Sequence, residues 1–297
     1  MQTTIQPEVF PFFEENSNTF SYIVKDPNSN DCAIVDSVLD FDYASGTIGY
    51  ESADEIIQCV QKRNLNVLYL IETHVHADHL SAAPYIQSIV GGKIAISKHI
   101  DTVQKTFGKV FNEGTEFKRD GTQFDVLFDD GETYKIGSVE GVAIHTPGHT
   151  PACMVHLIGD ACFVGDTIFM PDGGTARADF PGGDARTLYQ SIKKILSMPE
   201  ETRLFMCHDY QPNGRELEYQ TTVAQQKASN IHVHDGISEN DFVAMREARD
   251  ATLGMPKLIY PSLQTNMRAG HFPEADTNET VYLKVPISGL KQPLATH

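Results

Sequence analysis

The sequence predicts a layered α/β fold in which two halves, each a sheet with helices outside it, pack sheet against sheet. Two observations support this prediction. Strand-like segments followed by a helix occur once before residue 110 and again before residue 200. Residues 67–71 (Val-Leu-Tyr-Leu-Ile) form a continuous apolar run, which is typical of a strand buried on both faces.

In the first third of the chain, short strands precede a helix. Residues 19–25 and 32–36 have the composition of strands, and the turn-rich segment 26–31 separates them. Residues 52–55 (Ser-Ala-Asp-Glu) match a capping box, which predicts a helix that begins there and ends near Asn64. The predicted buried face of this helix carries Ile56, Ile57 and Val60.

From about Lys93 to Gly165 the sequence predicts mostly short strands joined by polar turns. Residues 129–132 (Asp-Asp-Gly-Glu) form one such turn. Further along, Asp184 is predicted to cap a helix whose apolar residues recur at helical spacing. The strands expected in this part of the chain cover residues 124–128, 133–136, 139–145, 153–158, 161–164 and 203–206, and the apolar positions of the helix are Leu188, Ile192, Ile195 and Leu196.

Beyond Asp209 the chain is predicted to become helical. Two helices are expected, over residues 217–229 and 238–253, and Pro256 ends the second. We therefore expect a catalytic domain over residues 1–212 and a C-terminal extension, residues 213–297, that packs on it and covers one side of the site.

Composition excludes several classes of protein. The formal net charge is −17 and Lys and Arg are not clustered, which argues against a nucleic-acid enzyme. The apolar runs are far shorter than the roughly 20 residues of a membrane span, and the stretch before Phe13 carries Glu8 but no basic residue, unlike a signal peptide. Five scattered cysteines without a CxxC pair argue against a disulfide framework. A cytoplasmic protein without a membrane segment is expected.

The most informative segment is Thr73-His-Val-His-Ala-Asp-His79, which directly follows the buried strand 67–71. Side chains alternate in an extended segment, so His74 and His76 point to the same side. Three imidazoles and a carboxylate within six residues at the end of a strand have no apolar packing role. The segment therefore predicts a metal site, and its last residues, 78–79, are expected to begin a helix that continues through residues 85–86.

Ligand-type residues follow three further predicted strands. His149 follows the strand 139–145, Asp166 follows the strand 161–164, and His208 follows the strand 203–206. Strand ends on a rigid scaffold are where binding residues are commonly placed. We therefore expect these side chains to converge with those of residues 74–79.

The ordered pattern HxHxDH, a Gly-His149-Thr, a Gly-Asp166-Thr and a late His208 resembles the signature of the metallo-β-lactamase superfold over roughly residues 10–210. The resemblance implies a four-layer αββα sandwich with the metal at the edge where the two sheets meet. It implies that His74, His149 and Asp166 hold a metal in every case. In two-metal members, His74, His76 and His149 would hold one metal, Asp78, His79 and His208 the second, and Asp166 would bridge them.

A second segment is similar to the persulfide dioxygenases (sulfur dioxygenases), in which Arg, Asp and Phe recur in a GR-x-DF-like stretch. Here the segment reads Ala-Arg177-Ala-Asp179-Phe180, with Ala in place of the Gly before Arg177. Residues 242–250 and 261–266 also resemble the bacterial branch of that family. The resemblance implies one Fe(II) per chain on His74, His149 and Asp166, a 2-His-1-carboxylate triad that leaves positions open for substrate and O2.

The resemblance also implies a reaction and a set of roles. Glutathione persulfide, O2 and water would give glutathione and sulfite, and the enzyme is expected to be a homodimer. Arg177 would pair with a glutathione carboxylate, or else form a surface ion pair. Tyr210 would donate its hydroxyl to the substrate or the metal-bound sulfur, or else form a structural hydrogen bond. The groups expected to orient the ligands and support catalysis are His76, Asp78, His79 and His208, and Asp179 is expected to be structural or to support a ligand.

Other hypotheses remain open from the sequence. The strongest alternative is a two-zinc glutathione thioesterase of the glyoxalase II type, in which a metal-activated hydroxide attacks a carbonyl. A metal-binding module without turnover is disfavoured by the complete ligand set. Asp36 could support the site from behind or simply form a turn, and the strand-end Cys207 is expected to be an inert buried thiol.

Overall fold

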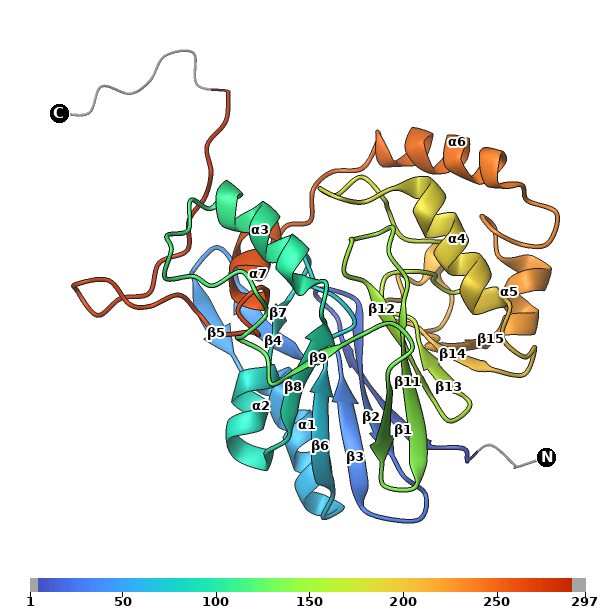
Figure 1. Ribbon diagram of the computed structural model, residues 1–297, viewed down its shortest axis with the longest axis horizontal. Coiled ribbons are helices and arrows are strands. Elements are labelled where there is room, and N and C mark those ends of the chain that lie inside the picture. Colours follow the sequence, from blue (N-terminus) through green and yellow to red (C-terminus); the bar gives the residue numbers. More distant parts are fainter. Residues whose placement is uncertain (1–4, 290–297) are drawn as a thin grey trace.

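The computed structural model describes residues 5–289, and it shows two facing β-sheets with helices on their outer faces (Figure 1). This four-layer αββα sandwich confirms the predicted fold class. The first sheet has the strand order β1 (Glu8–Glu14), β2 (Thr19–Lys25), β3 (Asp31–Val35), β6 (Asn66–Ile71), β8 (Lys93–Ser97) and β9 (Val126–Phe128). The second has the order β10 (Thr133–Ile136), β11 (Val139–His145), β12 (Met154–Ile158), β13 (Ala161–Phe163), β14 (Arg203–Phe205) and β15 (Gln220–Thr222).

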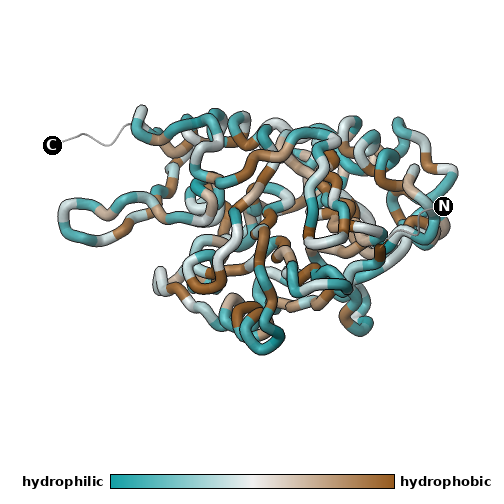
Figure 2. Tube along the Cα trace, turned by 60° about the horizontal axis from the view of Figure 1, so that its bottom comes forward, coloured by the Kyte–Doolittle hydropathy of each residue, from teal (hydrophilic) through white to brown (hydrophobic). Residues whose placement is uncertain are grey.

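Three layers of apolar side chains hold the four layers of secondary structure together. Between the two sheets lies an aromatic-rich core, whose largest fully buried members are Phe20, Tyr22, Phe128, Phe163 and Phe205. A second core packs α1 (Glu51–Lys62) and α2 (Ala83–Val90) on the first sheet, and a third packs α4 (Ala185–Leu196) on the second. In Figure 2 the hydrophobic stretches accordingly run through the middle of the molecule, and hydrophilic residues predominate along the outer loops.

The first helix begins differently from the prediction. Its N-terminal residue is Glu51 and the side chain of Ser52 makes no capping bond within the helix, so the predicted capping box is wrong. Instead, the backbone N–H and the hydroxyl of Ser52 both donate to the carboxylate of Asp40, at 2.9 and 2.7 Å. Asp40 lies on β4 (Val38–Asp42), which forms a small sheet with β5 (Thr47–Gly49) and β7 (Leu80–Ser81). A carboxylate distant in sequence therefore caps the helix.

Two further elements differ from the sequence-based expectation. The stretch predicted as mostly strands contains α3 (Ile100–Val110), whose residues Ile100, Val103 and Phe107 recur at helical spacing. His79 was expected to begin the following helix, but β7 intervenes and α2 begins only at Ala83. By contrast, Asp184 caps α4 as predicted, since its carboxylate accepts from the backbone N–H of Thr187.

The chain beyond residue 212 packs on both halves of the sandwich and adds a strand to the second sheet. The predicted helix 217–229 is in fact strand β15 followed by α5 (Val223–Ser229), and β15 pairs with β14 at the edge of the second sheet. Helices α5 and α6 (Glu239–Asp250) pack on α4, whereas α7 (Ile259–Asn266) packs on β7 at the other half (Figure 1). The division into domains 1–212 and 213–297 stays a prediction, and its residues 1–4 and 290–297 lie outside the described part of the chain.

Asp26 joins the turns of the two halves at the end opposite the metal ligands. Its buried carboxylate accepts hydrogen bonds from the backbone N–H groups of Asn28 and Ser138 and from the hydroxyls of Ser29 and Ser138. Burial alone would raise the pKa of Asp26, but these hydrogen bonds outweigh it and lower the pKa to about 2. The charged form is therefore the one that stabilises the fold.

We expect Asp26→Asn to lower the free energy of unfolding by about 2 kcal/mol at neutral pH. Because the folded-state pKa is depressed, this contribution is present above about pH 4 and is lost as the pH falls towards about 2. Denaturant unfolding of both proteins across this pH range measures it. A difference between wild type and variant that stays constant with pH would contradict the role of Asp26.

Candidate metal centre

The candidate ligands lie at strand ends along one edge of the sandwich, as the sequence predicted. His74, His76, Asp78 and His79 occupy the loop between β6 and β7, which we call the metal loop (residues 73–81). The others follow strands of the second sheet: His149 comes after β11, Asp166 after β13 and His208 after β14. Gly148, with φ +139°, lets the loop before His149 approach α4, because a Cβ there would lie 2.3 Å from the Cα of Leu188.

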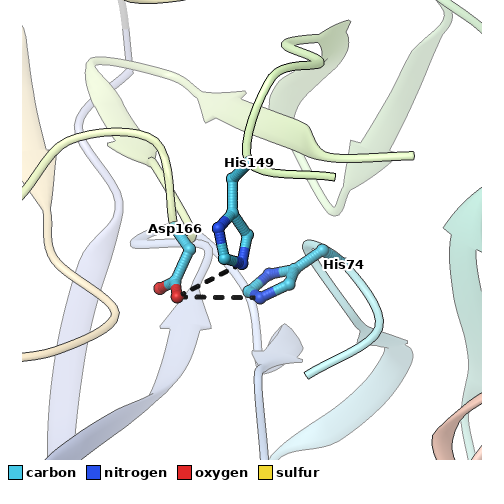
Figure 3. A group of neighbouring side chains, drawn as sticks. All are labelled: His74, His149 and Asp166. Carbon is cyan, nitrogen blue, oxygen red and sulfur yellow. Dashed lines mark ion pairs between the residues drawn. The ribbon is translucent and has the colours of Figure 1, made fainter. Parts of the chain in front are cut away.

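Figure 3 shows His74, His149 and Asp166 pointing toward a common centre. The Nε2 atoms of His74 and His149 lie 3.9 and 3.7 Å from the same oxygen, Oδ2 of Asp166. Both imidazoles are buried. Two imidazole nitrogens and one carboxylate oxygen at these separations form the donor set that a single metal ion requires.

A second set of donors adjoins the first and shares Asp166 with it. His76, Asp78 and His79 have donor atoms close enough together to hold an ion. The Nε2 of His208 lies 3.2 Å from Oδ1 of Asp166 and 3.4 Å from Oδ2 of Asp78. Asp166 therefore lies between the two sets of donors and can bind a metal held by either set.

In each imidazole one ring nitrogen contacts a polar group of the surrounding protein, and the other ring nitrogen is left for a metal. In four of the rings the anchored atom is Nδ1. In His149 and His79 it contacts a backbone carbonyl, that of Arg177 at 2.8 Å and that of Leu80 at 3.1 Å. In His74 it lies 3.1 Å from the Thr73 hydroxyl, and in His208 it lies 3.3 Å from the Asn18 carbonyl. In His76 the anchored atom is Nε2, 3.0 Å from Asp36. Such contacts fix the orientation of a ligand ring.

The atoms turned toward the centre lack hydrogen-bond partners among the described residues, although some of them lie at ion-pair distance from one another. Buried polar atoms without partners are rare, because each costs about 1–3 kcal/mol. The imidazole and carboxylate donors suit iron or zinc, so the residues fit a metal centre, although they do not identify the metal. The unpaired buried atoms are His74 Nε2, His76 Nδ1, Asp78 Oδ2, His79 Nε2, Asp166 Oδ1 and His208 Nε2.

The electrostatics of His74, His79 and Asp166 agree with metal binding, whereas in the metal-free protein neighbouring acidic groups outweigh burial and hold the pKa values of His76 and His208 well above the ordinary value. Burial lowers the pKa of His74 well below its ordinary value, and burial together with the charge of His76 lowers the pKa of His79 to about 4. Burial alone would raise the pKa of Asp166, but His208, His74 and His149 hold it well below its usual range. Neutral imidazoles and an ionised carboxylate are the forms that bind metals.

Asp36 supports the metal loop from behind. This buried residue has a positive φ of 51°, and its carboxylate accepts from the backbone N–H and the hydroxyl of Thr73, both at 2.8 Å, as well as contacting His76. The Sγ of Cys207 lies 3.7 Å away, and burial raises the pKa of that thiol. Cys207 is therefore a buried, protonated thiol, and Asp36 is more than a turn residue.

The segment Arg177-Ala-Asp179-Phe180 encloses the ligand His149. The carbonyl of Arg177 accepts from Nδ1 of His149, and the Phe180 ring packs edge-on against the imidazole with centroids 5.2 Å apart. The guanidinium of Arg177 lies over Phe180 and is held by both oxygens of Asp179, at 2.6 and 2.7 Å, and by the Gly254 carbonyl. The ion pair considered for Arg177 is thus present, and its role toward a substrate stays a prediction.

A cavity of about 1100 Å³ opens onto the metal centre. Asp78, His79, His149 and Asp166 lie at one end of it, and Tyr210 lines it with a side chain that is 56% exposed and stacks on His208. The extension adds Arg249 and Lys257 to the lining, and neither has an ion-pair partner within the described chain. A cavity of this size accommodates a substrate as large as a tripeptide.

Several residues of the site were not identified from the sequence. Glu72, whose Oε2 lies 3.4 Å from Nε2 of His76, comes directly after β6 and before the metal loop, and that position was a usable signal. Asn266, Arg249 and Lys257 come from the C-terminal extension, and no local spacing distinguishes them from surface or core residues. No helix within residues 5–289 is both long and apolar enough to cross a membrane.

Comparison with known proteins gives the family. The model of the metallo-beta-lactamase superfamily matches residues 16–208. The chain is 54% identical over 289 residues to a "probable metallo-hydrolase" of Burkholderia pseudomallei, covering 94% of this chain and 98% of the relative. It is 45% identical to "Glyoxylase B2" of Dictyostelium discoideum, covering 98% of this chain and all of the relative.

Persulfide dioxygenases are more distant relatives. The human mitochondrial persulfide dioxygenase ETHE1 is 27% identical over 261 residues, which is 87% of each chain. The crystal structure of ETHE1 from Myxococcus xanthus superposes with a TM-score of 0.70 at 26% identity and covers 89% of this chain and 100% of that one. By name, the more similar relatives are therefore hydrolase-like, and they favour the hydrolytic alternative over the dioxygenase. The chain belongs to the metallo-β-lactamase superfamily, and its site is that of a metal-dependent enzyme.

Proposed function

We propose that the protein is an iron-dependent persulfide dioxygenase that converts glutathione persulfide, O2 and water to glutathione and sulfite. One observation carries this proposal: the segment that resembles these dioxygenases, Arg177 to Phe180, directly encloses the ligand His149. The likeness to ETHE1 of Myxococcus xanthus over the whole of that chain supports it.

His74, His149 and Asp166 would hold the iron. Fe(II) in such a 2-His-1-carboxylate triad supplies open positions at which a sulfur ligand and O2 can meet. His76 takes part in other donor groups and is anchored by Asp36, which is consistent with a supporting role. Asp78, His79 and His208 would orient the ligands and hold protons beside the substrate. Tyr210 is exposed and lines the cavity, and its hydroxyl would donate to the substrate.

A two-zinc glutathione thioesterase is the second candidate, and two observations favour it. The unpaired donor atoms form two sets that share Asp166, which is what a pair of metals requires. The names of the relatives at 45–54% identity are those of a glyoxylase and a metallo-hydrolase. Both candidates place a glutathione conjugate in the same cavity and differ in the metal and in the use of O2.

Anaerobic purification followed by metal analysis and two activity assays separates the candidates. One iron per chain together with O2 uptake that depends on glutathione persulfide is the result expected for the dioxygenase. Two zincs per chain, no O2 uptake and rapid hydrolysis of a glutathione thioester would refute it in favour of the hydrolase. The expected homodimer is a separate proposal, tested by light scattering of the eluting protein.

The cations of the cavity lead to a prediction about substrate binding. Arg177 and Arg246 are already paired with Asp179 and Asp250, whereas Arg249 and Lys257 are unpaired in the described part of the chain and line the cavity. We expect Arg249→Ala to raise the KM for glutathione persulfide about tenfold with little change in kcat, because the lost contact is to a carboxylate distant from the reacting sulfur.

Lys227→Ala is the matched control for Arg249→Ala, since Lys227 also lies in the C-terminal extension but pairs with Glu200 on the surface. Its KM should remain that of the wild type. In the Arg177→Ala variant we expect a raised KM as well, and unchanged kinetics there would remove Arg177 from the substrate site. An unchanged KM in Arg249→Ala would place the substrate carboxylates elsewhere.

A further inference from the structure

The buried side chain of Asn266, at the end of α7, reaches the metal loop from nearly 190 residues away in the sequence. Its Nδ2 donates to the backbone carbonyls of His76 and His79, at 2.9 and 2.8 Å. Its Oδ1 accepts from the backbone N–H of Ser81 at 2.8 Å. One amide therefore satisfies three backbone groups of the loop that carries four candidate ligands.

These backbone groups depend on Asn266 because the metal loop lacks regular structure between β6 and the two-residue strand β7. A buried carbonyl or N–H group without a partner costs about 1–3 kcal/mol, so a loop that lost these bonds would shift to recover them. The shift would rotate the peptides that carry His76 and His79 and would move their ring nitrogens from the metal centre.

Two further features surround the Ser81 end of this loop. The hydroxyl of Ser81 donates to Glu72 at 2.7 Å, and Glu72 in turn contacts His76. Just beyond α7, Gly270 has a φ of +83°, and a Cβ there would lie 2.9 Å from the carbonyl oxygen of Ser81. The chain after α7 therefore approaches the loop too closely for a side chain at residue 270.

We infer that Asn266 is a positioning residue of the metal centre: it fixes the backbone of the metal loop so that the free nitrogens of His76 and His79 are held at the centre, either as ligands or as groups that orient the ligands. The C-terminal extension is then a part of the metal centre and not only a cover for the substrate cavity. The inference rests on the metal centre alone and not on either of the reactions proposed above.

The side-chain type at residue 266 is specific to this role. An amide supplies two N–H donors and one acceptor, which are the groups that the two carbonyls and the Ser81 N–H require. A carboxylate would face two carbonyl oxygens, and an apolar side chain would leave all three backbone groups unpaired. Substitution should therefore act on metal binding even where the fold is retained.

The test compares Asn266→Ala with Gln264→Ala. Gln264 is also a buried amide on α7, but its side chain bonds the carbonyl of Tyr260 and both backbone groups of Lys284, and within residues 5–289 it makes no hydrogen bond to the metal loop. Both variants lose a buried amide, so a general effect on stability should be similar. Cobalt(II) serves as the probe, because its visible absorption reports ligand geometry and its affinity is measured by competition with a chelator.

We expect Asn266→Ala to weaken cobalt(II) binding about tenfold or more and to change the visible spectrum, while Gln264→Ala leaves both as in the wild type. If Asn266→Ala does not fold, Asn266→Ser takes its place, since a hydroxyl can still pair with one backbone group. Wild-type affinity and spectrum in the folded Asn266 variant overturn the inference. An equal change in Gln264→Ala also overturns it, because the effect would then be general to α7.

Discussion

Asp166→Ala is expected to lose its metal, with an affinity reduced by more than about 100-fold and activity lost with it. Asp166 has a carboxylate oxygen close to both His74 and His149, and it also contacts His208. Its removal leaves only imidazoles in the triad and takes the shared ligand from a two-metal site. Metal content of the purified variant, measured by mass spectrometry after exhaustive dialysis, gives the result directly.

Asp160→Ala is the matched control for this loss. Asp160 is a partly buried carboxylate of the same half that pairs with Arg203 and is not among the candidate ligand groups. Its metal content should equal that of the wild type. An Asp166→Ala protein that retained a full complement of metal would contradict the ligand assignment under both candidate functions.

Asp36→Ala should be the most destabilising substitution near the site, lowering the free energy of unfolding by about 3–5 kcal/mol. The carboxylate is the acceptor for the backbone N–H and hydroxyl of Thr73 and the partner of His76, and all of these groups are buried. Alanine also fits poorly at a φ of 51°. Denaturant unfolding of the metal-free protein measures the loss without a contribution from metal binding.

Asp36→Asn separates the loss of the charged contact with His76 from the loss of the hydrogen bonds to Thr73 and from the strain of alanine at a positive φ. Asparagine tolerates the left-handed conformation and keeps one acceptor, but it cannot pair with a charged His76. We expect a smaller loss of stability than in Asp36→Ala. If Asp36→Ala cost less than about 1 kcal/mol, the hydrogen bonds around Thr73 would not be a main support of the loop.

Local patterns in the sequence predicted the parts of the fold that depend on neighbouring residues. Asp184 before the apolar residues of α4 identified a helix start, because an N-cap acts within four residues. The run 67–71 identified a buried central strand in the same way. The capping box at Ser52 was wrong because Asp40, on another strand, provides the carboxylate for that helix. α3 was missed although its apolar residues have helical spacing, because the strands around it dominated the prediction.

By itself the sequence determined the ligand types, their order along the chain and their position at strand ends. These are local properties, and their resemblance to the metallo-β-lactamase signature predicted the αββα fold and the superfamily. Only the tertiary structure decided what stands behind each ligand. Asp36 behind His76, the Arg177 carbonyl behind His149 and Asn266 beneath the metal loop act across dozens to nearly two hundred residues. Such contacts arise when distant segments pack together, so no spacing in the chain records them.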